Sequence, residues 1–342
     1  MNAAVYNGKM IQFKQDVENP KIKDEYVLIK VDSVGICGTD IAIVEGNLPV
    51  PVPIIPGHEF SGNIIEIDKK LNKKPQKNLL NARVTSEINT NICGNCYFCL
   101  NHIPSQCIKR KALGIDVNGA LAEKIAIHYS LIHQIPDNIS FEQATFIEPL
   151  AAAIQTFELM PLRKDDKNIT IFGLGKLGLL IFQVLKSMKL KNHNLILVGK
   201  HKIRIQVAEK LGAKNIINYA EVENIKKEVA KLTNGIGTDI AIDATGSANA
   251  LTEIIESTRS RGKIHIKSTH GTLSPINVTD LVVREINIYT SRCGPFNKAI
   301  KLINSGTINL KPLISKIFTL DKINDAFKIA ESKDILKVIV KV

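Results

Sequence analysis

Four of the six cysteines stand within fifteen residues, in the run CGNCYFCLNHIPSQC. Cys93, Cys96, Cys99 and Cys107 have the spacing C-x2-C-x2-C-x7-C, which places three sulfurs on one loop and returns the fourth after a longer excursion. Four thiolates form the donor set of a structural zinc site. Two disulfides are the alternative interpretation, but cysteines three residues apart would pair with strain. The spacing therefore predicts a structural zinc lobe over about residues 91–110.

A second group of residues with metal-ligand chemistry lies outside this lobe. Cys37 stands in GICGTD, His58 and Glu59 follow Gly57, and Glu148 stands in FIEPL. Singly, a cysteine or histidine is more commonly a core residue, so the prediction depends on the fold bringing these groups together. Cysteine, histidine and glutamate then offer three ligands and an open fourth position, as catalytic zinc sites do. Such a metal polarises a carbonyl group or lowers the pKa of a bound alcohol.

A glycine-rich loop predicts a dinucleotide site. The motif GLGKLG follows the apolar strand 168–172 and opens a helix with apolar residues at helical spacing over 177–188. In this context the glycines let the backbone approach a pyrophosphate, which lies at the positive end of the helix. A plain tight turn is the alternative. The predicted cofactor-binding residues of this loop are Gly173, Gly175, Lys176, Leu177 and Gly178.

The end of the next strand, 194–199, favours NADP(H) over NAD(H). An NAD site has an acidic residue there to bind the ribose hydroxyls. This chain instead has Gly199, 21 residues past Gly178. Lys200, His201 and Arg204 follow this glycine. Such cations suit a 2′-phosphate, although these side chains could also face solvent at a helix start. The predicted contacts to this phosphate and the adenine are Gly199, Lys200, His201, Arg204 and Tyr219.

The elements that carry these residues indicate two domains, as expected for 342 residues. Short strands and turns run to about residue 135, whereas strands alternate with amphipathic helices from 168 to 270. That alternation predicts an α/β fold with a doubly wound parallel sheet. The residues expected on buried helix faces are Leu177, Leu180, Ile181, Val184, Leu185, Met188, Ile205, Ala208, Leu211, Ile225, Val229 and Leu232.

Charge and hydropathy narrow the class of protein. The net charge of +12 comes from lysines that lack interleaved aromatic residues, as in 68–77 and 225–232. We therefore expect a solvated surface rather than a nucleic-acid interface. No apolar stretch reaches the length of a membrane span, and no leader segment is evident. Reduced thiolates fit the cytoplasm, which is the expected location.

These motifs, in this order and spacing, resemble the zinc-dependent medium-chain alcohol dehydrogenases. The branch with glutamate as third metal position, which holds polyol, threonine and sugar dehydrogenases, is most similar. The resemblance implies a GroES-like β-barrel catalytic domain over 1–152, a Rossmann domain over 153–288 and a C-terminal completion of the catalytic domain over 289–342. It also implies a homodimer or homotetramer.

The resemblance further implies roles for individual residues. Cys37, His58 and Glu148 correspond to zinc ligands, and Glu59 to a supporting or exchanging ligand. Asp40 would orient His58, and Thr39 would pass the substrate proton. Ala42 departs from the family, because many relatives have a histidine there that ends the proton relay.

We therefore expect an oxidoreductase with two zinc ions that transfers a hydride between NADP(H) and an alcohol/aldehyde or ketone pair. An NAD-linked polyol or sugar dehydrogenase is the first alternative, and a non-catalytic zinc- and nucleotide-binding protein the second.

Overall fold

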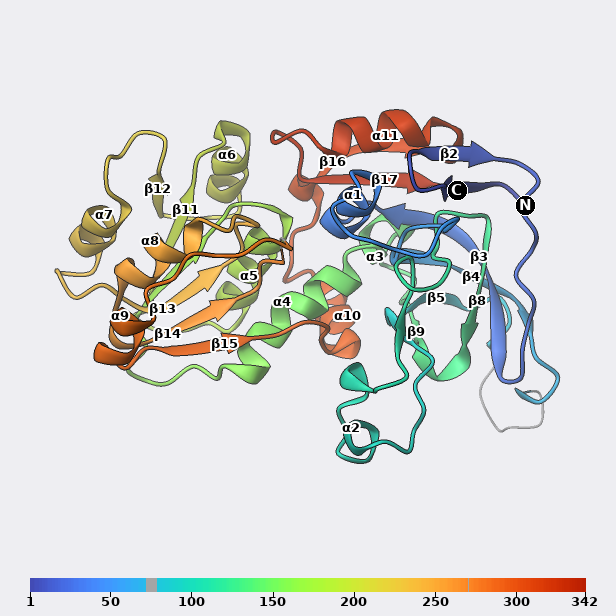
Figure 1. Ribbon diagram of the computed structural model, residues 1–342, viewed down its shortest axis with the longest axis horizontal. Coiled ribbons are helices and arrows are strands. Elements are labelled where there is room, and N and C mark those ends of the chain that lie inside the picture. Colours follow the sequence, from blue (N-terminus) through green and yellow to red (C-terminus); the bar gives the residue numbers. More distant parts are fainter. Residues whose placement is uncertain (72–78, 270) are drawn as a thin grey trace. The chain divides into compact units, whose positions relative to one another are not determined.

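The computed structural model describes residues 1–71, 79–269 and 271–342, which fall into two compact units (Figure 1). The first unit comprises Met1–Glu148, Ala299–Asn304 and Ile314–Val342, and the second comprises Pro149–Lys298 and Ser305–Leu313. The last strand of the second unit's sheet ends at Thr290, two residues past the domain boundary expected from the sequence.

The second unit is built on a six-stranded parallel sheet with the order β12-β11-β10-β13-β14-β15. Its central strand β10 pairs with β11 and β13, so that Ile171 lies opposite Leu197 and Ile242. Runs of β-branched residues suit strands that are covered on both faces. The strands are β10 (Asn168–Phe172), β11 (Asn194–Gly199), β12 (Asn215–Asn218), β13 (Thr238–Asp243), β14 (Thr258–Ile266) and β15 (Asn287–Thr290).

Helices alternate with these strands and cover the sheet (Figure 1). On one face, Ile254 and Ile255 of α8 and Val229 of α7 pack with Ile196 and Ile264 of the sheet. The helical elements along this part of the chain are α4 (Ile147–Leu159), α5 (Lys176–Ser187), α6 (Lys202–Lys210), α7 (Ile225–Leu232), α8 (Ala250–Ser257), α9 (Val278–Val283), α10 (Phe296–Asn304), which belongs to the first unit from Ala299 on, and η4 (Lys311–Leu313).

Most residues expected on buried helix faces are buried, but two predictions are wrong. Met188 is 38% exposed and Leu232 is 37% exposed. Both stand at helix C-termini, Met188 as the cap of α5 and Leu232 as the last residue of α7. Side chains at these ends have no further turn to hold them against the sheet, so the 3.6-residue period overestimates their burial.

The first unit contains a seven-stranded sheet with the order β16-β17-β3-β4-β5-β9, in which β8 also pairs with β3. Its core packs Val27, Ile29, Phe60 and Ile64 against apolar residues of the C-terminal segment such as Phe327. Its strands are β3 (Tyr26–Gly35), β4 (Glu59–Ile67), β5 (Arg83–Ser86), β8 (Lys124–His128), β9 (Ile132–Gln134), β16 (Ile314–Thr319) and β17 (Lys337–Lys341).

Two small sheets and several short helices complete this unit. The small sheets pair β1 with β2 and β6 with β7. Figure 1 shows the segment with α2 projecting from the rest of the unit. The remaining elements are β1 (Ala3–Tyr6), β2 (Ile11–Lys14), β6 (Asn89–Thr90), β7 (Lys111–Ala112), α1 (Gly38–Val44), α2 (Tyr97–Leu100), η2 (Pro104–Gln106), η3 (Tyr129–Leu131), α3 (Phe141–Ala144), η5 (Leu320–Lys322) and α11 (Ile323–Ala330).

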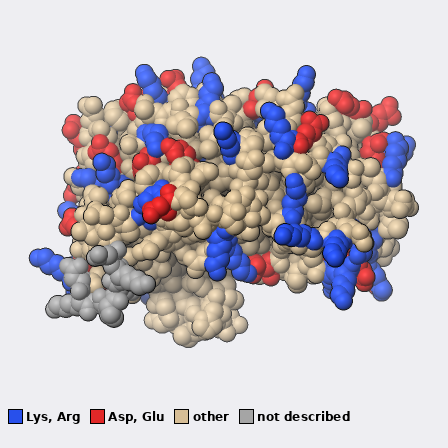
Figure 2. Space-filling view, turned by 180° about the vertical axis from the view of Figure 1, so that it is seen from behind, with Lys and Arg blue, Asp and Glu red and all other residues tan. Residues whose placement is uncertain are grey.

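The described residues contain no helix that is both long and apolar enough to span a bilayer. Figure 2 shows basic and acidic side chains interspersed over the face that it presents. The lysine-rich stretch at 68–77 lies mostly outside the described residues.

Candidate metal and nucleotide sites

The projecting segment brings the four clustered cysteines together. Their sulfurs all lie within 4.8 Å of one another. Neighbouring sulfurs are 3.6 Å apart for Cys96–Cys99 and 3.5 Å apart for Cys93–Cys107. A zinc–sulfur bond of about 2.3 Å in a tetrahedron separates its sulfurs by roughly 3.8 Å. All four cysteines are free thiols, so the structure has the arrangement of a tetrathiolate site and not the disulfides of the alternative interpretation.

Hydrogen bonds in this lobe lower the pKa of two of its four cysteines and so favour their thiolate form. Backbone N–H groups of Cys99 and Ile108 lower the pKa of Cys96 to about 6. Backbone N–H groups also lower the pKa of Cys107, with the amide of Cys93 contributing most. Burial and the neighbouring sulfurs raise the pKa of Cys99 to about 12. Sulfurs this close cannot all be anionic unless a cation lies among them, so the donor chemistry fits Zn²⁺.

A second cluster forms in the first unit from Cys37, His58 and Glu59, whose donor atoms also lie within 4.8 Å of one another. Cys37 caps the N-terminus of α1 shortly after β3, which ends at Gly35, and Glu59 begins the neighbouring strand β4. Because β3 pairs with β4 through Gly35 and Glu59, the strand register brings these groups together. Sequence spacing alone could not establish this meeting, which the fold provides.

Asp40 connects the parts of this cluster. Its carboxylate is fully buried and accepts hydrogen bonds from the backbone N–H of Cys37 at 2.8 Å and of Gly57 at 3.0 Å. Its Oδ1 atom also lies 3.6 Å from Nδ1 of His58. Asp40 thus faces Nδ1 of His58 at ion-pair distance, although Nδ1 forms no hydrogen bond within the described residues. Burial, the largest cause, raises the pKa of Asp40 above its usual value.

The cluster as a whole attracts a cation. Burial disfavours the charged form of His58, but the negative groups of Asp40, Cys37 and Glu148 raise its pKa to about 9. Such a rise shows that negative charge dominates a site where His58 is only 3% exposed. A soft thiolate, an imidazole and a carboxylate together suit zinc. Of the described residues, Glu59 rather than Glu148 completes the three grouped donors, and Glu148 acts on His58 through its charge.

Sequence reasoning missed one buried cation beside this cluster. Lys337, the first residue of β17, is 0% exposed and forms an ion pair with Oε2 of Glu59, which is 1% exposed. Its burial, the largest cause, lowers the pKa of Lys337 to about 8. A lysine within the apolar run LKVIVKV is a signal that could have identified this position.

In the second unit, the glycine-rich loop has the close packing that its motif requires. Gly173 has a φ of +100°, and a Cβ atom there would lie 2.5 Å from the carbonyl oxygen of Ala244. A Cβ atom on Gly178 would strike the carbonyl group of Gly173. Gly175 caps α5, and Lys176 begins it. The loop therefore presents bare backbone at a helix N-terminus, which suits a phosphate.

Of the residues predicted to select the cofactor, Arg204 lies beside this loop. A Cβ atom on Gly175 would be 3.8 Å from the Nη1 atom of Arg204. Nζ of Lys200 lies 5.2 Å from the ring centroid of Tyr219. His201 caps the N-terminus of α6. These observations place a guanidinium group beside the loop, as expected for a site that binds an additional phosphate.

Close packing also requires a glycine at position 199. A Cβ atom there would lie 2.6 Å from Cγ of Leu174. The Leu174 side chain therefore covers the end of β11, where an NAD site would carry its carboxylate.

The carboxyl ends of β13 and β14 carry a polar network that sequence reasoning did not find. Oδ1 of Asp243 accepts hydrogen bonds from the hydroxyl groups of Thr245 at 2.8 Å and Ser268 at 2.9 Å. Ser268 in turn accepts from the backbone N–H of Gly246. The network fixes the turn after β13, which packs against Gly173.

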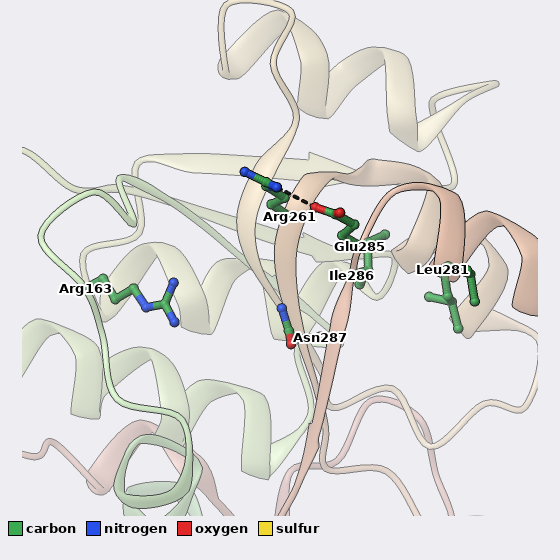
Figure 3. Close-up of a pocket in the computed structure, with 7 residues that line it drawn as sticks. Arg163, Arg261, Leu281, Glu285, Ile286 and Asn287 are labelled. Atoms are coloured by element: carbon green, nitrogen blue, oxygen red, sulfur yellow. Dashed lines mark hydrogen bonds and ion pairs between the residues drawn. The ribbon is translucent and has the colours of Figure 1, made fainter.

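A pocket in the second unit lies away from these predicted residues (Figure 3). Leu281 and Ile286 are among its lining residues, and Arg261 forms an ion pair with Glu285. None of the described residues that line it is a predicted site residue.

Comparison with known proteins shows which family domains the chain contains. Residues 23–137 match the alcohol dehydrogenase GroES-like domain, and residues 177–305 match the zinc-binding dehydrogenase family. A D-arabitol-phosphate dehydrogenase from Enterococcus avium is 32% identical over 94% of this chain and 91% of its own. A sorbitol dehydrogenase from Bacillus subtilis is 30% identical over 96% of this chain and 93% of its own.

A solved structure agrees with both domains. The 2R,3R-butanediol dehydrogenase from Bacillus subtilis matches with a TM-score of 0.86 at 27% identity, covering 100% of this chain and 99% of its own. The chain therefore belongs to the zinc-dependent medium-chain alcohol dehydrogenases. Within that family it lies in the polyol and sugar dehydrogenase branch, as the resemblance predicted. The protein is an NAD(P)-dependent oxidoreductase that acts on CH–OH groups.

Proposed function

We propose that the protein interconverts a polyol-type alcohol and its carbonyl product with NADP(H) as hydride carrier. The observation that carries the catalytic part is the buried cluster of Cys37, His58 and Glu59. The relatives named for D-arabitol phosphate and sorbitol support a polyhydroxylated substrate.

The residues of the metal cluster have separate tasks in this proposal. Cys37 and His58 hold the metal, Asp40 orients His58, and Glu148 or Glu59 supplies the third ligand. Zinc, when bound, polarises the C–O group of the substrate. The Thr39 hydroxyl, 3.7 Å from Sγ of Cys37, takes the proton of the alcohol during oxidation and returns it during reduction. Ala42 has no group that continues this relay, so we assign its next step to water or the cofactor ribose.

NADP(H) is the proposed cofactor because cationic groups replace the carboxylate of an NAD site. Arg204 lies beside the glycine-rich loop, and Lys200 lies beside Tyr219. Arg204 and Lys200 bind the 2′-phosphate, and Tyr219 stacks on the adenine. His201 adds a hydrogen bond at the start of α6.

Initial-rate measurements test this function. A panel of polyols, their phosphates and simple alcohols is oxidised with NADP⁺ and with NAD⁺, and the nicotinamide absorbance is followed. We expect a higher kcat/KM with NADP⁺ on a polyhydroxylated substrate. A tenfold or larger preference for NAD⁺ would contradict the cofactor proposal, and turnover of simple alcohols alone would contradict the substrate proposal.

We also propose two zinc ions per chain, one in the cluster of four cysteines and one in the Cys37 cluster. Elemental analysis of protein purified in reductant without chelator should give two zinc equivalents. Because the thiolates must stay reduced, we propose the cytoplasm as the location.

Assembly into a homodimer is proposed to use the edge strand β15. This strand pairs only with β14 in the described sheet, and its Ile288 is 40% exposed. Val282 and Val283 at the end of α9, which precedes this strand, are 69% and 75% exposed. An open strand edge beside exposed apolar side chains is a surface for pairing with another strand.

Light scattering of the native protein should give the mass of at least a dimer. The double variant Ile288→Lys/Val283→Glu should reduce that mass to the mass of a monomer. An unchanged mass would contradict the proposed surface.

A further inference from the structure

The carboxyl ends of four parallel strands in the second unit form one row of paired residues. The last residues of β10, β13, β14 and β15 in this row are Phe172, Asp243, Ile266 and Thr290. The glycine-rich loop begins one residue beyond the row, and Lys267 lies one residue beyond it after β14. A dinucleotide binds along such an edge. With the adenosine half beside β11 and the pyrophosphate at the loop after β10, the nicotinamide half lies towards β13, β14 and β15.

Lys267 places a buried ammonium group at this edge. The residue is only 7% exposed. Its Nζ donates to Oγ of Ser291 at 2.9 Å, to the carbonyl oxygen of Ser291 at 3.2 Å and to that of Arg292 at 3.2 Å. These acceptors lie in the segment 291–295, which follows β15 and is part of neither a strand nor a helix. The lysine therefore holds backbone that no regular secondary structure holds.

The same segment also packs closely against α4. A Cβ atom on Gly294 would collide with the carbonyl group of Ala151 in that helix. The segment is thus fixed at Ser291 and Arg292 by hydrogen bonds and at Gly294 by close packing.

His265 extends the network on β14. Its Nε2 lies 2.9 Å from Oγ of Ser291. Burial, and secondly the charge of Lys267, lowers the pKa of His265 to about 4, so the imidazole is neutral near pH 7. Because the ammonium group of Lys267 can only donate, the Ser291 hydroxyl donates its own proton to Nε2.

This arrangement has a cost in folding free energy. The ring proton of His265 then lies on Nδ1, which is buried and has no hydrogen-bond partner among the described residues. A buried cation and an unpaired buried donor both disfavour the folded state. Apolar residues at positions 265 and 267 would avoid both, so the network favours a role in ligand binding over one in stability.

We propose that Lys267 is a positioning residue for the nicotinamide half of the cofactor, because it holds the backbone of Ser291 and Arg292 at the edge where that half lies. This inference rests on the proposed binding of the adenosine half beside β11. Without the ammonium group, the segment 291–295 loses three charge-assisted hydrogen bonds. The adenosine half lies on the other side of β10, so its contacts remain.

Equilibrium binding of two ligands tests this role. NADPH contains the nicotinamide, whereas 2′-phospho-ADP-ribose has the same adenine, riboses and phosphates without it. In calorimetric titrations, Lys267→Met should bind NADPH roughly tenfold more weakly than the native protein does, because hydrogen bonds to a charged group are lost. Its affinity for 2′-phospho-ADP-ribose should change by no more than about twofold, since distant sites act independently. If the native enzyme prefers NADH, the pair of ligands is NADH and ADP-ribose.

A second buried lysine on the same strand provides the matched control. Lys263 is 4% exposed, and its Nζ donates to Oδ2 of Asp166 at 2.7 Å. The double variant Lys263→Met/Asp166→Asn removes this ion pair without leaving an unpaired charge. Whatever its melting temperature, it should keep the native ratio of the two affinities. Equal losses for both ligands in Lys267→Met, or native affinity for both, would overturn the inference.

Ser291→Ala is a second variant, which removes the hydroxyl between Lys267 and His265 and keeps the charge. It should weaken NADPH binding selectively by about threefold, so it decides the question if Lys267→Met fails to fold. The emission of bound NADPH reports the surroundings of the nicotinamide and should shift in both variants but not in the control. If the native protein binds neither ligand, the proposed cofactor site fails; if it binds both and the variants keep the native ratio, only the role of Lys267 fails.

Discussion

Substitution of Arg204 by methionine should weaken the use of NADPH selectively. The guanidinium group lies beside Gly175, where a Cβ atom would be 3.8 Å from Nη1, and the residue is half-buried. Water therefore screens its interaction with a phosphate only in part. A hydrogen bond to a charged group contributes about 1.5–3 kcal/mol, which corresponds to roughly one to two decades in affinity. We expect kcat/KM for NADPH to fall by that factor and kcat/KM for NADH to change little.

Stopped-flow or steady-state rates with both reduced cofactors and one saturating carbonyl substrate measure this effect. Lys202→Met is the matched control, because Lys202 also lies in the first turn of α6 but is exposed. Equal losses with NADPH and NADH would place Arg204 on the shared pyrophosphate and refute its role in selection. Gly199→Asp is a poorer test, because its Cβ atom would lie 2.6 Å from Leu174 and would displace the loop.

Two further predictions concern the lobe and the pH dependence of stability. Cys96→Ser should remove one zinc equivalent and lower the melting temperature, because metal binding contributes folding free energy; Cys293→Ser, outside both clusters, should retain two. Burial, and secondly the charge of Lys267, lowers the pKa of His265 to about 4. Between about pH 6.5 and 4 the unfolded chain therefore binds a proton at this histidine that the folded chain does not. The free energy of unfolding is thus lost as pH falls from about 6.5 towards 4. His265→Gln should reduce the slope of stability against pH in that window by up to about 1.4 kcal/mol per unit; an unchanged slope in urea unfolding would contradict this cause.

Strands and helices of the second unit could be predicted closely because their signals are local. β10 and β11 have the bounds expected from their apolar runs, 168–172 and 194–199. Met188 and Leu232 were wrongly expected to be buried, because periodicity does not show where a helix leaves the sheet. The arrangement of the four cysteines was also predictable, since all lie on one short segment.

Features made by long-range pairing could not be predicted from spacing. Lys337 meets Glu59 only because β17 and β4 both pair with β3. The network around Asp243 likewise depends on Ser268 at the end of the neighbouring strand. The grouping of Glu59 with Cys37 and His58 also follows from strand register. For Lys337 and Asp243 the residue type was visible in the sequence, but its partner was not; the Cys37, His58 and Glu59 group was predicted from its ligand types and the family resemblance.

The central claim is that the Cys37 cluster holds a catalytic zinc for alcohol oxidation with NADP⁺. The most direct measurement compares native protein and Cys37→Ser for zinc content and for NADP⁺ reduction with a polyol panel. We predict two zinc equivalents and turnover in the native protein, and one equivalent, an unchanged fold and no turnover in the variant. Retention of two zinc ions or of native turnover in Cys37→Ser would contradict the claim.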